Sequence, residues 1–297
     1  MEDDSYFEAV RTALAPRYRI EREIGHGAYA TVFLATSSSS SQPVAVKILK
    51  PEWSQAVARE RFLREIRVTG QLHHENILPL LDSGELGGFL FFVMPYVSGL
   101  TLRHKLRGNR QLAVAEVLRI ARQVAAGLSG AHSQGVLHRD IKPENILLED
   151  GRALVADFGI AKAFTDSGVE TITSTGLGIG TPPYMSPEQA SGEHHLDERS
   201  DVYSFACLVY EMLVGETPYT GPTAQVIVAK KLSQPVPSVR ALRETLSPEV
   251  DGVLRRGLAA LQAGLPIGRH RDERDVADRR LRLGLDLGLA LRRPAPR

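Results

Sequence analysis

The chain has 297 residues, 43% of them hydrophobic, and a formal net charge of +1 at pH 7. This length is enough for two lobes with separate cores, and the small net charge argues against nucleic acid or an anionic membrane as the main partner. The single cysteine, Cys207, excludes an internal disulfide and a thiolate metal cluster. The acidic start, Met1–Asp4, has no apolar core of a secretory signal, and no apolar run reaches the roughly eighteen residues of a membrane helix. We therefore expect a cytoplasmic protein with no membrane span in this chain.

Residues 18–97 consist mostly of short β-branched or aromatic runs separated by Gly, Ser and Pro, which predicts a series of strands. Residues 24–32 read as a strand, a glycine-rich turn and a returning strand. Gly25 and Gly27 would let backbone N–H groups approach phosphate oxygens without a Cβ in the way. Two glycines are weak evidence alone, because any hairpin turn could use them.

Lys47 ends a short apolar strand, residues 44–47. A lysine in such a strand is costly unless its charge is paired. We expect the partner to be Glu65, in the helical run 59–66, with Glu60 as the alternative. Most other charges of this run fit a solvated helix face.

Two further elements precede the most informative motif. Residues 89–94 read as a buried strand. Residues 115–132 carry apolar residues at a spacing of three and four, which predicts a helix with a core-facing stripe. This helix leads directly to residues 138–145.

Residues 138–145 read His-Arg-Asp-Ile-Lys-Pro-Glu-Asn, and Asp157-Phe158-Gly159 follows an apolar hairpin. Asp140 can accept the proton of an incoming hydroxyl, and Asn145 and Asp157 can supply the oxygen ligands that Mg²⁺ prefers. An isolated Asp-Phe-Gly could be a simple turn. Its position after Asn145 and the hairpin makes coincidence negligible, and the set suits phosphoryl transfer from a metal nucleotide.

These motifs resemble the catalytic loop and metal-binding turn of eukaryotic-type protein serine/threonine kinases, in the form found in bacteria. The resemblance implies an α+β, bilobal protein-kinase fold, with a small antiparallel β-sheet lobe containing one key helix and a larger, mainly helical lobe. It divides the chain into an N-terminal extension with the small nucleotide-binding lobe (1–97), a large catalytic and substrate lobe (98–261) and an atypical charge-rich tail (262–297).

The resemblance also implies an activity: transfer of the γ-phosphoryl group of ATP, with Mg²⁺, to Ser or Thr hydroxyls of proteins. Lys47 would hold the α- and β-phosphates, Glu65 would orient it, Asp140 would act as the base, and Lys142 would contact the γ-phosphate. The implied catalytic residues are Lys47, Glu65, Asp140, Lys142, Asn145 and Asp157, of which Asn145 and Asp157 would hold the metal.

The residues that follow the strand 89–94 resemble the hinge between the lobes, with Met94 as the gatekeeper behind the adenine. Adenine recognition in the family uses the carbonyl at Pro95 and the N–H and carbonyl of Val97, and proline removes only an N–H. The family's third loop glycine is Ala30 here, which predicts a stiffer loop. The implied nucleotide-binding residues are Ile24, Gly25, Gly27, Val32, Ala45, Lys47, Met94, Pro95, Val97 and Leu147. Their aliphatic members fit an ordinary core equally well.

The loop between Asp157 and Glu188 is rich in Gly, Ser and Thr, and its end resembles an activation segment. Thr181 matches the family threonine that bonds the base and the lysine in serine/threonine kinases. Arg139 would receive a phosphate from this loop. The candidate acceptors are Thr171, Thr173, Ser174 and Thr175, of which Thr173 and Thr175 are favoured. A transient dimer would allow one copy to phosphorylate another.

Asp201 opens the next buried helix. We expect it to cap this helix and, as in the family, to brace the backbone of the catalytic loop. Cys207 in the same helix reads as an inert core thiol.

Beyond Leu261 the resemblance ends, because charges alternate densely and leucines then alternate with Gly or charge. Arg269 formally matches a family arginine that pairs with Glu188. A change of reading frame or a truncation near Leu261 would explain the shift equally well.

Two other classes of function remain open at this point. Ala30, Pro95 and the unusual C-terminal residues slightly favour a pseudokinase, a nucleotide-binding or scaffolding protein without turnover. The intact catalytic residues weigh against it. A small-molecule phosphotransferase is the third reading, and Thr181 with the Pro-Glu end of the activation segment argues for a docked peptide instead.

Overall fold

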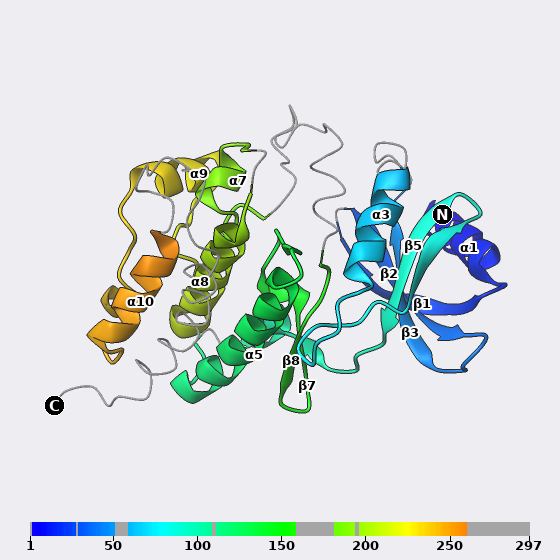
Figure 1. The fold of residues 1–297 in the computed structure, drawn as a ribbon, viewed down its shortest axis with the longest axis horizontal. Coiled ribbons are helices and arrows are strands. Elements are labelled where there is room, and N and C mark those ends of the chain that lie inside the picture. The colour runs from blue at the N-terminus through cyan, green and yellow to red at the C-terminus, as the bar shows by residue number, and fades with distance from the viewer. Residues whose placement is uncertain are drawn as a thin grey trace.

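The computed structural model describes residues 2–27, 29–50, 59–108, 111–158, 181–193 and 196–259. In these ranges the chain forms two lobes, one built around a β-sheet and one mainly helical (Figure 1). The sheet lobe contains α1 (Glu2–Leu14), β1 (Tyr18–His26), β2 (Ala30–Ser37), β3 (Pro43–Leu49), α3 (Arg59–Thr69), β4 (Asp82–Leu86) and β5 (Phe89–Pro95). The other lobe contains β6 (Leu100–Thr101), α4 (Leu102–Gly108), α5 (Val114–His132), η1 (Pro143–Asn145), β7 (Ile146–Glu149), β8 (Arg152–Val155), α7 (Pro187–Ala190), α8 (Glu198–Val214), α9 (Ala224–Ser233), η2 (Val239–Ala241) and α10 (Pro248–Leu258). The α+β, bilobal fold predicted from the sequence is confirmed.

The sheet of the smaller lobe has five antiparallel strands in the order β1-β2-β3-β5-β4. The central strand β3 is buried on both faces at Val44, Ala45 and Val46, which explains why its apolar residues do not alternate with polar ones. β1 lies at the edge and is mostly exposed in its second half. The glycine-rich turn between β1 and β2 therefore lies at the end of the outermost strand pair.

An N-terminal helix, α1, covers part of this sheet, and the sequence analysis did not predict it (Figure 1). Val10 and Leu14 are fully buried in the same cluster as Phe33 of β2. The ring of Phe7 lies 5.9 Å from that of Phe33, and Tyr6 packs edge-on against Phe89 at 5.9 Å. The apolar residues of α1 therefore complete the core on one face of the sheet.

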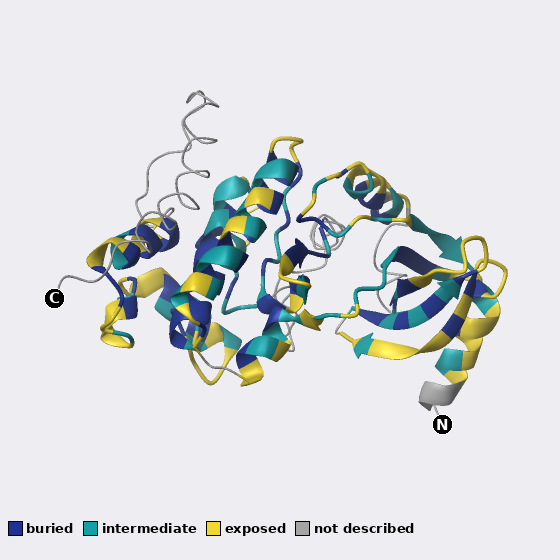
Figure 2. Ribbon diagram, turned by 90° about the horizontal axis from the view of Figure 1, so that it is seen from below, coloured by how far each residue is buried: buried dark blue, intermediate teal, exposed yellow. Residues whose placement is uncertain are grey.

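The larger lobe is organised around α8, which lies between α5 and α10 (Figure 1) and is buried along almost its whole length. Figure 2 shows the buried residues of this lobe in dark blue between its helices. Cys207 lies within it and is fully buried, as predicted. The predicted cap was wrong: α8 begins earlier than expected, so Asp197 is the N-cap and its side chain accepts from the N–H of Arg199. Gly215 ends the helix with φ 88°, a left-handed conformation that favours glycine.

A short sheet, β6-β7-β8, lies at the junction of the lobes and carries the catalytic-loop residues to their place. The β7–β8 pair is the apolar hairpin predicted between Asn145 and Asp157, and Ile146 and Val155 face each other across it. The N–H of Ala156 donates to the carbonyl of Asn145 at 2.9 Å. The hairpin therefore brings its two ends, and the two predicted metal ligands beside them, close together.

Candidate active site

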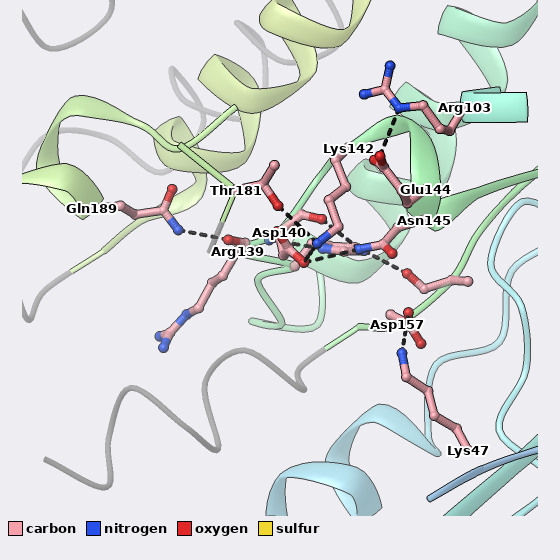
Figure 3. A network of polar contacts seen from close by, with 12 residues as sticks. Lys47, Arg103, Arg139, Asp140, Lys142, Glu144, Asn145, Asp157, Thr181 and Gln189 are labelled. Carbon is pink, nitrogen blue, oxygen red and sulfur yellow. Dashed lines mark hydrogen bonds and ion pairs between the residues drawn. The ribbon is translucent and has the colours of Figure 1, made fainter. Parts of the chain in front are cut away.

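The catalytic loop places three predicted residues in one hydrogen-bonded group (Figure 3). Lys142 Nζ lies 2.6 Å from Asp140 Oδ2 and 3.0 Å from Thr181 Oγ1. Asn145 Nδ2 donates to the backbone carbonyl of Asp140 at 2.8 Å and lies 3.3 Å from its Oδ2. The carboxylate of Asp140 is thus held by a lysine and an amide. The same lysine connects it to Thr181, near the end of the predicted activation segment.

The backbone of this loop is held by Asp201 on α8. Asp201 Oδ1 accepts from the N–H of Arg139 at 2.7 Å, and Oδ2 accepts from the N–H of His138 at 2.8 Å. Arg139 has φ 69°, a conformation that is strained for a residue with a side chain. The two bonds to Asp201 support this strained conformation, so the predicted bracing role of Asp201 agrees with the geometry.

A third bond to Asp201 comes from His132, which the sequence analysis did not single out. His132 Nε2 lies 2.7 Å from Asp201 Oδ2, and both side chains are 1% exposed. Burial acts to raise the pKa of Asp201, but the hydrogen bond and charge of His132, together with His138, lower it below the usual value. The only sequence signal for this contact was a histidine at the end of a helix, which is not specific.

The orientation of His138 is fixed from both sides of its ring. Its Nε2 lies 2.8 Å from the carbonyl of Ala156, and its Nδ1 accepts from the N–H of Asp140 at 3.2 Å. The ring packs against Phe158, with centroids 4.6 Å apart. His138 therefore ties the catalytic loop to the turn that carries Asp157.

Lys47 of β3 reaches across to this turn. Its Nζ lies 2.6 Å from Asp157 Oδ2, and each side chain is 18% exposed (Figure 3). Burial acts to raise the pKa of Asp157, but the charge and hydrogen bond of Lys47, with the charges of His138 and Lys142, keep it below its usual value. Asp157 is therefore ionised at neutral pH.

The predicted ion pair between Lys47 and Glu65 is not among the ion pairs of the described residues. Glu65 is 8% exposed, and its carboxylate lies 3.5 Å from Arg64 Nη2. The physical reason is competition, because the carboxylate of Asp157 already accepts from Lys47 Nζ. Helix α3 contacts the metal-binding turn in another way: Thr69 Oγ1 donates to the carbonyl of Phe158 at 3.3 Å.

The predicted nucleotide-binding residues come together in part. Sheet pairing places Val32 beside both Gly25 and Lys47, and Ala45 directly opposite Met94. Gly27 N donates to the carbonyl of Ala30 at 2.9 Å, which closes the turn. Ile24 is 36% exposed, Pro95 ends β5, Val97 follows it, and Leu147 lies in β7. The roles of these residues toward adenine stay predictions.

The end of the predicted activation segment is anchored at α7. Ser186 and Gln189 form a capping box, and Gln189 Nε2 donates to the carbonyl of Arg139 at 2.8 Å. Glu188 is 6% exposed, and its Oε1 accepts from Ser200 Oγ. The proposed Glu188 partner, Arg269, lies outside the described residues, as do the candidate acceptors Thr171, Thr173, Ser174 and Thr175.

A second polar network beside the catalytic loop, buried in part, was missed from the sequence. Arg103 on α4 donates to Glu144 at 2.8 Å, to Glu211 at 2.6 Å and to the hydroxyl of Tyr184 at 2.6 Å. The Tyr184 hydroxyl in turn donates to Glu211. Burial raises the pKa of Tyr184, and Glu211 acts in the same direction. This network joins the catalytic loop to α8 and to the segment after Thr181.

Comparison with known proteins found a matching family and several similar proteins. The family described as protein kinase domain matches residues 18–261. The serine/threonine-protein kinases PknH and PknD of Mycobacterium tuberculosis (strain ATCC 25618 / H37Rv) are 37% and 38% identical, each over 82% of this chain. A probable serine/threonine-protein kinase of Bifidobacterium longum, pknA2, is 36% identical over 79% of it. The aligned regions span 38%, 36% and 31% of these relatives, so the chain matches well under half of their lengths.

None of the helices in the described ranges combines the length and apolar composition needed to cross a membrane.

Proposed function

Because the chain belongs to the protein kinase domain family, we propose that it is a protein serine/threonine kinase that transfers the γ-phosphoryl group of ATP to Ser or Thr hydroxyls of proteins. The observation that carries this proposal is the bridge formed by Lys142 between Asp140 and Thr181. It joins a carboxylate that can take a hydroxyl proton to a threonine on the segment where an acceptor peptide would lie.

In this proposal Asp140 positions the acceptor hydroxyl and takes its proton late, because the transition state of phosphoryl transfer is loose. Lys142 neutralises charge on the transferred group, and its bond to Asp140 keeps both groups at the reacting atoms. Most of the rate enhancement then comes from positioning and from fixed charges, as expected where little covalent chemistry is required.

The residues present fit a magnesium ion. Asp157 Oδ2 is occupied by Lys47, whereas Asp157 Oδ1 is buried and has no hydrogen-bond partner among the described residues. Such an atom is costly to bury unless it has a ligand. The side-chain oxygen of Asn145 is the second donor, and one carboxylate plus one amide suits Mg²⁺, which keeps several of its waters. When bound, Mg²⁺ neutralises phosphate charge and orients the nucleotide.

Lys47 would change partners when the nucleotide binds. Protein-kinase catalysis requires the β3 lysine to pair with the helix glutamate, which here is Glu65. We propose that the phosphates of ATP and the metal draw Lys47 away from Asp157, so that Lys47 can pair with Glu65 and be oriented by it. Residues 25–27 would supply backbone N–H groups to the phosphates.

Autophosphorylation is the second part of the proposal. A phosphate on Thr173 or Thr175 would form charge-assisted bonds with Arg139, whose backbone is already held by Asp201 and Gln189. A transient dimer would allow this reaction to occur between two copies of the chain.

The acceptor class is tested with the full chain, Mg-ATP and matched peptides that differ only in carrying Ser, Thr, Tyr or Ala at one position. We expect phosphate incorporation into the Ser and Thr peptides only. Incorporation into Tyr, or into a set of sugars and amino alcohols but no peptide, would overturn the proposal. ATP binding without any transfer would indicate the pseudokinase.

A further inference from the structure

A buried lysine on α9, Lys231, contacts the backbone of residues 181–185. The residue is 0% exposed. Its Nζ donates to the carbonyl of Pro182 at 2.8 Å and to the carbonyl of Met185, and it lies 3.5 Å from the carbonyl of Pro183. A charge buried this completely is costly unless several acceptors compensate it, and here three backbone carbonyls do so.

The segment 181–185 needs an external donor because of its sequence. It contains two adjacent prolines, which have no N–H, so it has more carbonyls than N–H groups. The carbonyl of Thr181 accepts from the N–H groups of Tyr184 and Met185, at 2.9 and 3.2 Å, and the carbonyl of Tyr184 accepts from Ser204 Oγ at 2.8 Å. The three remaining carbonyls are those that Lys231 contacts. Every carbonyl of the segment is thereby accounted for.

The same segment carries the side chain that reaches the reacting group. The hydroxyl of Thr181 accepts from Lys142, which is bonded to Asp140. The carbonyl of Thr181 closes this turn by accepting from Tyr184 and Met185, and Lys231 bonds to other carbonyls of the same turn. Movement of this turn would therefore move the Thr181 hydroxyl relative to the base.

We infer that Lys231 is a positioning residue for protein acceptors: its ammonium group holds residues 181–185 in the shape that receives the acceptor segment beside Asp140. This inference rests on the proposed phosphoryl transfer to proteins. It assigns a role to a residue outside the set proposed to hold the nucleotide, so it predicts a defect confined to the acceptor.

The surroundings of Lys231 favour a charged donor over a neutral one. The ammonium lies 5.1 Å from the centroid of the Tyr203 ring, a favourable cation–π distance. Burial lowers the pKa of Lys231 to about 8, while Cys207 and Glu188 act in the opposite direction. Burial also raises the pKa of Cys207 to about 12 and raises that of Tyr203. Lys231 is therefore the group of this cluster that changes charge in the weakly alkaline range, and it loses one of its three donor protons there.

The test compares Lys231→Met, Lys231→Arg and Lys230→Met in the full chain. Methionine has a similar length but no donor, and arginine restores donors. Lys230, the neighbouring lysine, bonds to the carbonyl of Thr220, away from residues 181–185, and is the matched control. The probe is the peptide that the wild-type chain phosphorylates fastest in the acceptor panel.

We expect Lys231→Met to raise the peptide KM on the order of ten- to a hundredfold, the cost of misplacing a substrate. The KM for ATP and the rate of ATP hydrolysis without peptide should stay within about twofold. Lys231→Arg should recover most of the defect, and Lys230→Met should show none. In the wild type the peptide KM should rise from pH 7 to 9, and in Lys231→Arg it should not. An unchanged peptide KM in Lys231→Met, or equal losses toward peptide and ATP, would overturn the inference.

Amide hydrogen exchange tests, without any catalysis, whether Lys231 holds residues 181–185. The N–H groups of Tyr184 and Met185 should exchange faster in Lys231→Met, with protection in α8 and in the sheet unchanged. Equal protection in both proteins, or a loss of protection spread over the whole chain, would refute the claim that Lys231 holds this segment. If the wild type phosphorylates no peptide at all, the proposed function fails, and the exchange result decides separately whether Lys231 holds the segment.

Discussion

Lys47 Nζ lies 2.6 Å from Asp157 Oδ2, and this contact joins the central strand of the sheet lobe to the turn beside the catalytic loop. The two residues are far apart in the sequence and belong to different lobes. One oxygen of Asp157 is used by Lys47, and the other has no hydrogen-bond partner in the part of the chain that the structure describes. Asp157 thus has both a partner that fixes it and an atom ready for a metal.

Replacement of Asp157 by Asn should abolish phosphoryl transfer. The carboxamide keeps the shape and can still accept from Lys47, but it loses the charge that binds Mg²⁺. A metal contribution of several kcal/mol corresponds to a loss of at least about a hundredfold in kcat. The Mg²⁺ dependence of ATP affinity should also disappear. Asp150→Asn, in the exposed β7–β8 turn, is the control, and activity of Asp157→Asn within a few fold of the wild type would contradict the assignment.

Two substitutions of Thr181 test the role of its hydroxyl separately from that of its branched shape. Val keeps the branched side chain but removes the acceptor of the 3.0 Å bond from Lys142, whereas Ser keeps the hydroxyl. A hydrogen bond to a charged group contributes about 1.5–3 kcal/mol, so kcat/KM for a peptide should fall roughly ten- to a hundredfold in Thr181→Val. Thr181→Ser should remain close to the wild type. Equal rates in the two variants would show that the bond has no role in transfer.

Replacement of Asp201 by Asn should lower stability as well as activity. The amide cannot accept from His132, His138 and Arg139 as the carboxylate does, and a buried donor without a partner costs about 1–3 kcal/mol. Urea unfolding measures this loss. Asp197→Asn is the control, because Asn also caps helices, and its cost should be within about 0.5 kcal/mol. A loss no larger in Asp201→Asn than in the control would remove the bracing role.

The same variant has a defined pH dependence. The pKa of Asp201 is lower in the folded chain than in the unfolded one, so the unfolded state binds more protons as the pH falls between the two values. The stability that Asp201 contributes is therefore complete above the unfolded pKa, near 4, and is lost as the pH falls through the lower, folded value. Below about pH 4 the difference in stability between wild type and Asp201→Asn should shrink. A difference that stays constant down to acid pH would contradict this account.

Helix α1 should contribute to the stability of the sheet lobe. Leu14 is fully buried, and Leu→Ala at such a site costs about 2–5 kcal/mol. Arg11→Ala on the same helix, where the side chain is 57% exposed, should change the free energy of unfolding by less than about 0.5 kcal/mol. The measurement is urea unfolding followed by far-UV circular dichroism, a signal that does not rely on tryptophan. Equal effects of the two substitutions would show that α1 does not pack as described.

The sequence predicted best those features that depend on neighbouring residues. The group of Asp140, Lys142 and Asn145 lies within one short loop, so its spacing alone brings the side chains together. The β7–β8 hairpin then places Asp157 beside it, because an apolar hairpin returns the chain to its starting point. Local geometry therefore explains why these predicted residues lie close together, whereas their roles were inferred from the family resemblance.

Features that depend on tertiary packing were missed or were predicted with the wrong partner. The partner of Lys47 is decided by which of two carboxylates reaches it, and no spacing encodes that competition. Lys231 was not singled out from the sequence, and the packing of α9 against residues 182–185 buries it. Helix α1 did leave a signal, because Tyr6, Val10 and Leu14 are spaced by four residues on one helix face.

The measurement that tests the central claim most directly is intact-mass spectrometry of the phosphatase-treated chain after incubation with Mg-ATP, beside Asp140→Asn. Removal of a general base typically costs about 10²–10⁴-fold in rate. We predict mass steps of one phosphate in the wild type, which peptide mapping places on Thr173 or Thr175, and none in Asp140→Asn over the same time. Wild type that binds ATP but gains no mass, or equal gains in both proteins, would contradict the assignment of this chain as a kinase that uses Asp140.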